Sequence, residues 1–238
     1  MEYRKYPRSL HFSWSPGATS DDKMLSGTDH FVGQEIIVSE KLDGENTTIY
    51  PGGYTHARSL DSRNHPSRDW MRAEAARIGR DIPEGVRVNG ENCFAVHSIT
   101  YSALPSYFMV FGMVEGSKPA RRLSGRDGMV EDGRFLDWDT TVAYAEMLGL
   151  HMAPVLYRGP WDEAAVKACY TGASRCGGLQ EGYVARLARS FPVSEFGLSL
   201  AKYVRENHVD SSSHWMHERV IPNGLRETSS DFSGNLRA

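Results

Sequence analysis

Residues 36–46 read Ile-Ile-Val-Ser-Glu-Lys-Leu-Asp-Gly-Glu-Asn, and the interpretation of the whole chain starts from this stretch. The run Thr47–Tyr50 that follows is β-prone like Ile36–Val38, and an Asp-Gly pair lies between the two runs. This pattern predicts a strand, a tight turn and a second strand, which form a central strand pair. Lys41 would then stand at the rim of the sheet, where the first strand ends.

Lys41 has two interpretations on this evidence alone. An amine that is half withdrawn from water and close to other cations can lose its proton near neutral pH and attack an electrophile. Alternatively, Lys41 is a surface side chain beside a hairpin turn, because Lys-x-Asp-Gly is a short pattern and turns favour Asp-Gly. The rest of the chain has to decide between a nucleophile and a surface lysine.

The composition is that of a folded globular protein, with 238 residues, 40% of them hydrophobic and 24% charged. A chain of this length forms one large domain or two small ones. Its apolar runs are much shorter than the roughly 20 residues that span a bilayer, so we expect no membrane segment. The net charge of -3 means that a polyanionic partner would need a local basic patch.

The three cysteines form no Cys-x-x-Cys pair, which argues against a zinc knuckle and fits a reducing compartment. The first six residues are polar and lack the apolar stretch of a secretion signal. We therefore expect a cytoplasmic protein.

Apolar periodicity predicts a sheet-rich chain with three helices. Ser67 is expected to cap the first helix, Asp139 to begin the second, and Pro160 to lie in the first turn of the third. The unbroken apolar run at 107–114 indicates a strand in the centre of a sheet. We expect strands at 54–59, 86–92, 107–114, 153–157, 183–186 and 199–205, helices at 68–82, 139–148 and 160–170, and loops at 115–135 and 171–178.

The N-terminal 33 residues are rich in aromatic side chains but show no regular period. We interpret these aromatics as plugs packed on the main core, and a stacking platform for nucleic-acid bases is the alternative. They are Tyr3, Tyr6, Phe12 and Trp14.

Six short motifs follow one another along the chain, and each is weak by itself. Their order and spacing resemble the motifs of the covalent nucleotidyltransferases, a superfamily of ATP-dependent DNA ligases, RNA ligases and mRNA capping enzymes. The motifs are Lys41-Leu42-Asp43-Gly44, Arg58, Glu91, Phe111, Glu181-Gly182-Tyr183-Val184 and Lys202.

Two further residues narrow the resemblance to the RNA ligase 2-like group of ATP-dependent RNA ligases. Asn46 stands two residues after Gly44, where DNA ligases and capping enzymes usually carry arginine, and Glu40 precedes the lysine. The resemblance covers about residues 35 to 206.

The resemblance implies an α+β fold, the bilobed nucleotidyltransferase or ATP-grasp-like ligase adenylation fold. It is built from mainly antiparallel sheets with flanking helices, and the nucleotide lies in a cleft between the sheets. We expect residues 1–238 to form one such domain, with 1–33 and 206–238 as family-specific extensions that could cover the cleft. No separate C-terminal OB or helical domain is expected, so the protein is a minimal ligase or uses an accessory domain or protein.

The implied activity is that of an RNA ligase (ATP). Lys41 would attack the α-phosphate of ATP, and the resulting lysyl-AMP would transfer AMP to an RNA 5'-phosphate before a 3'-hydroxyl seals the strand. Phosphoryl transfer asks the protein mostly for positioning and charge stabilisation. By resemblance, the catalytic residues are Lys41, Glu181 and Lys202.

The resemblance also implies how the nucleotide and metal are held. Lys202 and Arg58 would face the α-phosphate, while Glu181 and Glu91 would anchor Mg²⁺, for which Mn²⁺ can substitute. Cationic neighbours and the metal would lower the pKa of Lys41. For the nucleoside itself, Glu91 would hold the ribose, Phe111 would stack on adenine, Glu40 would contact the base edge, and Asn46 would also bind the nucleotide.

RNA contacts are expected from basic residues near these motifs. The arginines of the first helix are either a solvated face or nucleic-acid ligands, and Asn46 is a candidate reader of the RNA 2'-hydroxyl. The family usually has a second lysine where Val204 stands, and alternation along a strand turns Arg205 away from the phosphate. The candidate RNA ligands are Asn46, Arg63, Arg68 and Arg205.

Three alternatives stay open: a DNA ligase, a capping-type guanylyltransferase, and a module that binds a nucleotide or an RNA end without turnover.

Overall fold

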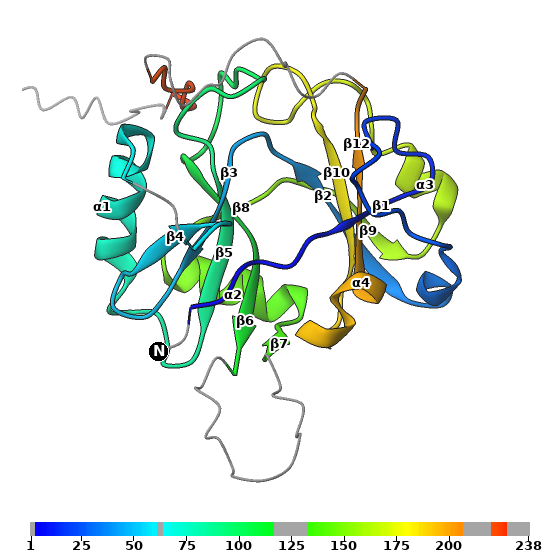
Figure 1. Cartoon of the computed structure of the whole chain (residues 1–238), viewed down its shortest axis with the longest axis horizontal. Coiled ribbons are helices and arrows are strands. Elements are labelled where there is room, and N and C mark those ends of the chain that lie inside the picture. The colour runs from blue at the N-terminus through cyan, green and yellow to red at the C-terminus, as the bar shows by residue number, and fades with distance from the viewer. Residues whose placement is uncertain (1–2, 61–63, 117–132, 207–219, 228–238) are drawn as a thin grey trace, which may run out of the picture.

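The structure is a computed structural model, and it describes residues 3–60, 64–116, 133–206 and 220–227. Its strands form two sheets that lie beside each other, as Figure 1 shows. Helix α1 (Asp69–Ile78) lies at the outer side of one sheet and helix α3 (Glu163–Lys167) at the outer side of the other. Within the described residues, no helix is long and apolar enough to span a membrane.

The five-stranded sheet carries the strand that ends at Lys41. Its antiparallel core is buried on both faces: Ile36 and Val38 face one apolar cluster, while Ile37 packs against Trp138 on the other side. This explains why the sequence at 36–38 is continuously apolar and does not alternate. The strand order is β1 (Leu10–His11), β12 (Leu200–Val204), β10 (Gly182–Leu187), β2 (Glu35–Lys41) and β9 (Val155–Pro160), with β1 parallel to β12.

The seven-stranded sheet supplies the opposite side of the molecule. Its central strand comes from the apolar run at 107–114, as predicted, and it shares a buried apolar cluster with Ile49 and Val88 of the same sheet and with residues of helix α1. The order is β11 (Phe191–Pro192), β7 (Arg134–Phe135), β6 (Phe108–Glu115), β5 (Arg87–Asn92), β3 (Glu45–Ile49) and β4 (Thr55–Ala57), and β8 (His151–Met152) also pairs with β6.

The prediction that the strands around Asp43-Gly44 pair with each other is wrong. β2 pairs with β9 and β10, whereas β3 pairs with β4 and β5, so residues 42–44 carry the chain from one sheet to the other. The carboxylate of Asp43 accepts hydrogen bonds from the N–H groups of Ser98 and Ile99 and from the Ser98 hydroxyl, each at 2.8 Å. A distant loop therefore holds the Asp-Gly pair that we expected to close a hairpin.

Two of the three predicted helices are shorter in the structure, and the caps differ. Helix α1 ends at Ile78, and the Gly79 that follows packs so closely on Gly53 that a Cβ atom there would lie 2.3 Å from the Gly53 nitrogen. Asp137, and not Asp139, caps α2, since its side chain accepts the N–H of Thr140 at 2.9 Å. The helices are α1 (Asp69–Ile78), α2 (Trp138–Met147), α3 (Glu163–Lys167) and α4 (Phe196–Ser199), and the 3-10 turns are η1 (Asp29–Phe31), η2 (Pro66–Arg68) and η3 (Val193–Glu195).

Two predictions near these helices are corrected. The expected helix at 160–170 is reduced to α3, because β9 extends to Pro160 and Asp162 caps the helix by accepting the N–H groups of Ala164 and Ala165. Ser67 does not cap α1 but lies within the preceding turn η2, where its N–H donates to the ring of His65.

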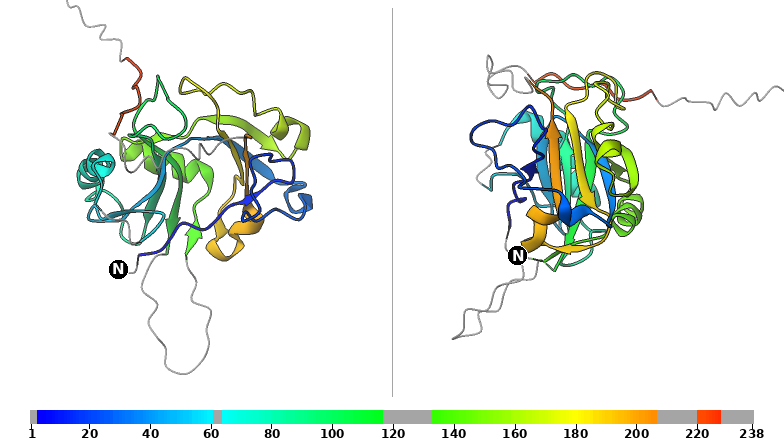
Figure 2. Two further views of the ribbon diagram at one scale, coloured as in Figure 1. Left: turned by 45° about the horizontal axis from the view of Figure 1, so that its top comes forward. Right: turned by 90° about the vertical axis from the view of Figure 1, so that its right-hand side faces the viewer.

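The N-terminal segment joins the two sheets. The N–H of Arg4 donates to the hydroxyl of Tyr50 at 2.8 Å, next to the seven-stranded sheet, and Leu10–His11 pair with β12 in the other sheet. Figure 2 shows this segment running along the outside of both sheets. Phe12 is buried in the core and Trp14 packs against it, donating to the hydroxyl of Tyr183 at 2.9 Å, which confirms their role as plugs.

Candidate functional site

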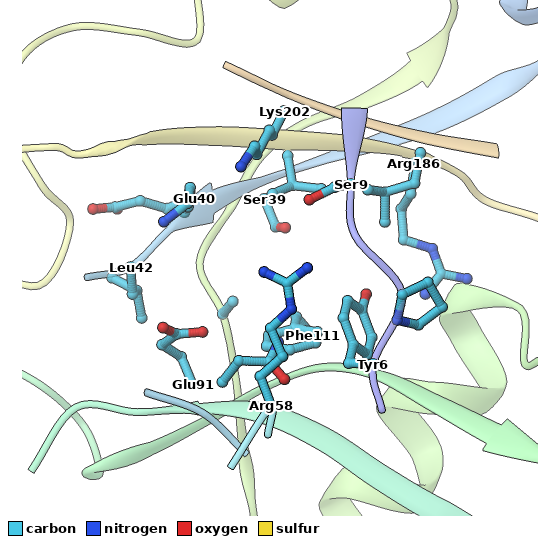
Figure 3. Close-up of a pocket in the computed structure, with 16 residues that line it drawn as sticks. Tyr6, Ser9, Ser39, Glu40, Leu42, Arg58, Glu91, Phe111, Arg186 and Lys202 are labelled. Atoms are coloured by element: carbon cyan, nitrogen blue, oxygen red, sulfur yellow. The ribbon is translucent and has the colours of Figure 1, made fainter. Parts of the chain in front are cut away.

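A pocket of about 220 Å³ lies between the two sheets, and Lys41 is one of its lining residues. The five-stranded sheet contributes Lys41 and Lys202, and the seven-stranded sheet contributes Glu91 and Phe111. Figure 3 shows Lys202 on one side of this space and Glu91 and Phe111 on the other. The order of motifs in the sequence therefore predicted residues that share one pocket.

Strand register explains how Lys41 meets Glu181. β10 runs antiparallel to β2 with Gly182 opposite Lys41, so Glu181 lies just beyond the paired residues at the same end of the sheet. The Nζ atom of Lys41 donates to Oε2 of Glu181 at 2.5 Å. Glu181 is only 4% exposed, so this ion pair lies mostly out of water. A buried pair of this kind fixes the direction of the amine.

The protein groups around Lys41 keep it charged. Burial by itself would lower the pKa of Lys41, but the carboxylates of Glu181 and Glu91 outweigh burial and raise the pKa above its ordinary value. The expectation that neighbouring cations lower the pKa of Lys41 is therefore wrong for the protein groups alone. The lysine whose pKa is lowered is Lys202: burial has the largest effect, and the charge of Lys41 adds to it.

Two carboxyl groups lie beside the Lys41 amine: Glu91, which lines the pocket, and Glu181, which is hydrogen-bonded to Lys41. Burial raises the pKa of Glu91 to about 8, against the lowering effect of Lys41 and with a further rise from Glu181. Burial also raises the pKa of Glu181. Within the described residues there is no group of three or more His, Cys, Asp or Glu side chains that could hold a metal ion. The pair fits the one or two carboxylates that Mg²⁺ uses when substrate phosphates complete its coordination.

Phe111 and Tyr6 form an aromatic wall of the pocket. Their rings meet edge to face with centroids 5.1 Å apart, and both residues line the cavity. Phe111 lies on β6 and is half-buried, while Val184 lies on the wall that belongs to the other sheet. A flat aromatic ligand between these walls would find apolar surface on both sides.

Two of the residues that line the pocket each carry a buried oxygen atom that has no hydrogen-bond partner within the described residues. One is Oε1 of Glu40, a residue only 2% exposed whose other oxygen accepts the N–H of Arg175 at 3.0 Å. The second is Oδ1 of Asn46. Both residues line the pocket. Because buried acceptors are normally satisfied, these two fit a ligand that brings N–H or O–H donors.

Two cations point into the pocket from opposite sides. Lys202 lies on β12. Arg58 was expected on the return strand, but it lies one residue after the end of β4. Neither side chain forms a hydrogen bond or an ion pair within the part of the chain that the structure describes. Figure 3 shows both directed into the same space. Burial, and then the charge of Arg8, lower the pKa of Arg58.

The predicted RNA ligands are not gathered at this pocket, apart from Asn46. Arg68 is paired with Glu45, its Nε lying 2.7 Å from Oε1, and does not line the pocket. Arg205 follows β12, does not line the pocket either, and its guanidinium donates to the carbonyl of Glu206 at 3.2 Å. Arg63 lies outside the described residues.

Sequence reasoning missed Tyr6 and Arg186 as pocket residues. Arg186 is buried on β10 and donates to the carbonyl oxygens of Leu136 at 2.7 Å and Leu187 at 3.1 Å, and burial lowers its pKa to about 10. Strand alternation places it on the same face as Val184, a signal that could have found it. Tyr6 carries no comparable signal, because it reaches the site through an irregular segment.

The fold and this site define an α+β protein with a nucleotidyltransferase-like architecture, as the sequence predicted. A family model described as RNA ligase matches residues 34–204. The chain belongs to the RNA ligase family. No curated protein matches the sequence.

Solved structures of an RNA ligase from Naegleria gruberi share this fold. A variant with ATP and Mn and another variant with AMP and Mn each match with a TM-score of 0.51 and 15% identity, covering 75% of this chain and 52% of theirs. The same ligase with PPi matches with a TM-score of 0.51 and 15% identity, covering 75% and 51%. This chain thus spans about half the length of the ligase that it resembles, and at this identity the likeness shows the fold alone.

Proposed function

We propose that the protein is an ATP-dependent RNA ligase whose adenylation domain works through an AMP adduct on Lys41. The observation that carries the proposal is the pocket itself. It brings together one half-buried amine, two cations and two buried acceptor atoms, and within the described residues these cations and acceptors have no hydrogen-bond partner. This set of groups matches the α-phosphate, the further phosphates and the donor groups of adenosine.

In the first step the Nζ–P bond forms and the bond from the α-phosphorus to pyrophosphate breaks. Lys41 must give up a proton before it attacks, and Glu181 is the nearest acceptor, at 2.5 Å. Lys202 and Arg58 stabilise the charge that develops on the phosphate oxygens. A divalent cation held by Glu181 and Glu91 would offset the carboxylate charge that keeps Lys41 protonated.

We infer the identity of the nucleoside from the pocket residues that would contact it. Phe111 stacks on the base, and the unpaired oxygen of Glu40 accepts from an exocyclic amino group at the base edge. Adenine offers such a donor where guanine offers a carbonyl, so Glu40 favours ATP over GTP. Asn46 and Glu91 accept from ribose hydroxyls.

The later steps transfer AMP from Lys41 to an RNA 5'-phosphate, after which a 3'-hydroxyl displaces AMP and seals the strand. Family membership supports RNA as the polynucleotide. We propose that an accessory domain or protein engages the RNA ends.

Labelling with ATP tests the proposal. Incubation with ATP radiolabelled at the α-phosphate and Mg²⁺ or Mn²⁺ should label the protein, and mass spectrometry should locate AMP on Lys41. Lys41→Ala should abolish the label, whereas Lys167→Ala, an exposed lysine on α3, should leave it unchanged. Label from GTP only would point to a guanylyltransferase, and an unlabelled protein would point to a binding module.

Nick sealing tests the substrate. A duplex nick with RNA at the 3'-hydroxyl side should be sealed, and an all-DNA nick should not. Equal sealing of both nicks would favour a DNA ligase.

A further inference from the structure

The segment at residues 221–226 binds along one loop of the seven-stranded sheet. The N–H of Val96 donates to Ile221, the N–H of Leu104 donates to Gly224, and the N–H of Arg226 donates back to Leu104, all at 2.8 to 3.0 Å. Figure 1 shows this segment in red beside the loop, which spans residues 93–107 between β5 and β6. The segment does not line the pocket, so these residues do not form the cleft cover that the sequence suggested for the C-terminal extension.

Asn223 fastens both arms of this loop. Its Nδ2 donates to the carbonyl oxygens of Cys93 at 2.8 Å and Ala95 at 3.3 Å, and its Oδ1 accepts the N–H of Tyr101 at 2.7 Å. Its backbone N–H donates to Phe94 at 2.9 Å. The residue is only 3% exposed. Every polar group of its side chain is therefore used to hold one arm of the loop against the other.

The same loop holds the turn that follows Lys41. Ser98 and Ile99 donate to the carboxylate of Asp43, and the Asp43 N–H donates to the hydroxyl of Tyr101, each at 2.8 Å. The backbone of Tyr101 thus binds Asn223, while its side chain binds the residue two positions after Lys41. The loop also begins two residues after Glu91, so both walls of the site depend on its position.

We propose that Asn223 is a positioning residue for lysine adenylylation, acting through the loop at 93–107 and Asp43 on the direction of the Lys41 amine. This inference rests on the proposed function. Asn223 does not line the pocket, so its loss should slow the chemical step and leave ATP binding nearly unchanged. Small displacements matter at this step, because in-line attack needs the amine placed to within a fraction of an ångström.

The experiment compares Asn223→Ala with Ile221→Ala in the full chain. Ile221 lies in the same segment but is 61% exposed, so its truncation removes little packing. We expect Asn223→Ala to lower the rate constant of self-adenylylation at saturating ATP by about tenfold or more, with KM for ATP changed less than about twofold. Ile221→Ala should match the wild type. A wild-type rate for Asn223→Ala, or a loss confined to KM, would overturn the proposal.

A double-mutant cycle separates positioning from general weakening. If Asn223 acts through Asp43, the variant with both Asn223→Ala and Asp43→Ala should be about as slow as the slower single variant. If the rate loss of the double variant equals the product of the two single losses, the two residues act independently. That result would overturn the relay, the proposal that Asn223 acts through Asp43. If Asn223→Ala does not fold, Ser98→Ala replaces it in the cycle with the same expectation, because Ser98 is exposed and donates to Asp43 from the middle of the loop.

Amide hydrogen exchange keeps this proposal distinct from the proposed function. The N–H groups of Ser98 and Ile99, both held by Asp43, should exchange faster in Asn223→Ala than in the wild type. Faster exchange supports the relay even if the wild type forms no AMP adduct, a result that would refute only the proposed function. Unchanged exchange would overturn the relay.

Discussion

Replacing Gly182 with alanine would test whether the spacing of β10 and β12 sets the catalytic geometry. A Cβ atom at this position would lie 2.0 Å from the carbonyl oxygen of Tyr203 and 2.9 Å from its carbonyl carbon. Real Cβ atoms essentially never come closer than 3.0 Å, so the strands must separate by about 1 Å there. Because the opposing atoms belong to the backbone, no change of rotamer can relieve the contact.

The displacement falls where three site residues meet. Gly182 is paired with Lys41 on one side and Val204 on the other, so separating the strands moves Glu181 relative to Lys41 or to Lys202. Overpacking of this kind destabilises by about 1 to 3 kcal/mol. A misplacement of about 1 Å can cost about 100-fold in rate. We expect Gly182→Ala to show both effects.

The measurements are urea unfolding for stability and the rate of AMP labelling at saturating ATP for catalysis. Gly197→Ala is the matched control, because the nearest atom to its added Cβ would be Leu10 Cδ1 at an ordinary 3.7 Å. That control lies in α4 and should keep the wild-type rate, with stability equal to or about 0.5 to 1 kcal/mol above the wild type. A Gly182→Ala protein with wild-type stability and wild-type labelling would refute the link between strand spacing and catalysis.

Three further predictions concern single side chains. Phe111→Ala should raise KM for ATP about tenfold, since base stacking is worth about 1 to 3 kcal/mol. Phe111→Tyr keeps an aromatic ring and should keep most of the ATP binding. Equal KM values for the wild type and the alanine variant would exclude stacking. Arg68→Ala should lower the free energy of unfolding by about 1 to 3 kcal/mol, because it leaves the half-buried Glu45 unpaired. Arg72→Ala, at an exposed residue, should lower the free energy of unfolding by less than about 1 kcal/mol. Equal losses of stability in the two variants would contradict this reasoning. Backbone hydrogen bonding lowers the pKa of Asp137, so the charged cap stabilises the fold fully above the ordinary aspartate pKa of about 4, and this contribution is lost as the pH falls through the lower folded pKa. The loss of about 1 kcal/mol in Asp137→Ala at pH 7 should therefore shrink in unfolding curves recorded at successively lower pH below about 4, and a loss that stays constant would contradict this reasoning.

Local patterns predicted the strands and the residues that share the pocket, but not which strands pair. The apolar run at 36–38 identifies a buried strand, whereas its partners at 155–160 and 182–187 lie more than 100 residues away. Nothing near Asp43-Gly44 indicates that a loop at 93–107 holds the turn. The local sequence favours a hairpin, but contacts with residues far away in the chain determine how these strands pair.

The pKa shifts at the site were harder to predict from the sequence than the residues that form it. The order of motifs brought Lys41, Glu181 and Lys202 together: Lys41 and Lys202 line the pocket, and Glu181 is hydrogen-bonded to Lys41. The sign of the effect on Lys41 depends on which neighbour is nearest, and strand register puts Glu181 at 2.5 Å. Sequence alone does not give such distances, so the direction of the pKa shift was wrong.

The site residues on the five-stranded sheet come from both halves of the chain. Lys41 lies on β2, whereas β10 and β12, which follow it across the sheet, end only at Leu187 and Val204. During synthesis the nucleophile therefore emerges from the ribosome long before these two strands. Until they have been translated, the amine lacks its partner Glu181 and the second lysine, Lys202, so we expect that a nascent chain does not react with ATP before both strands have joined the sheet.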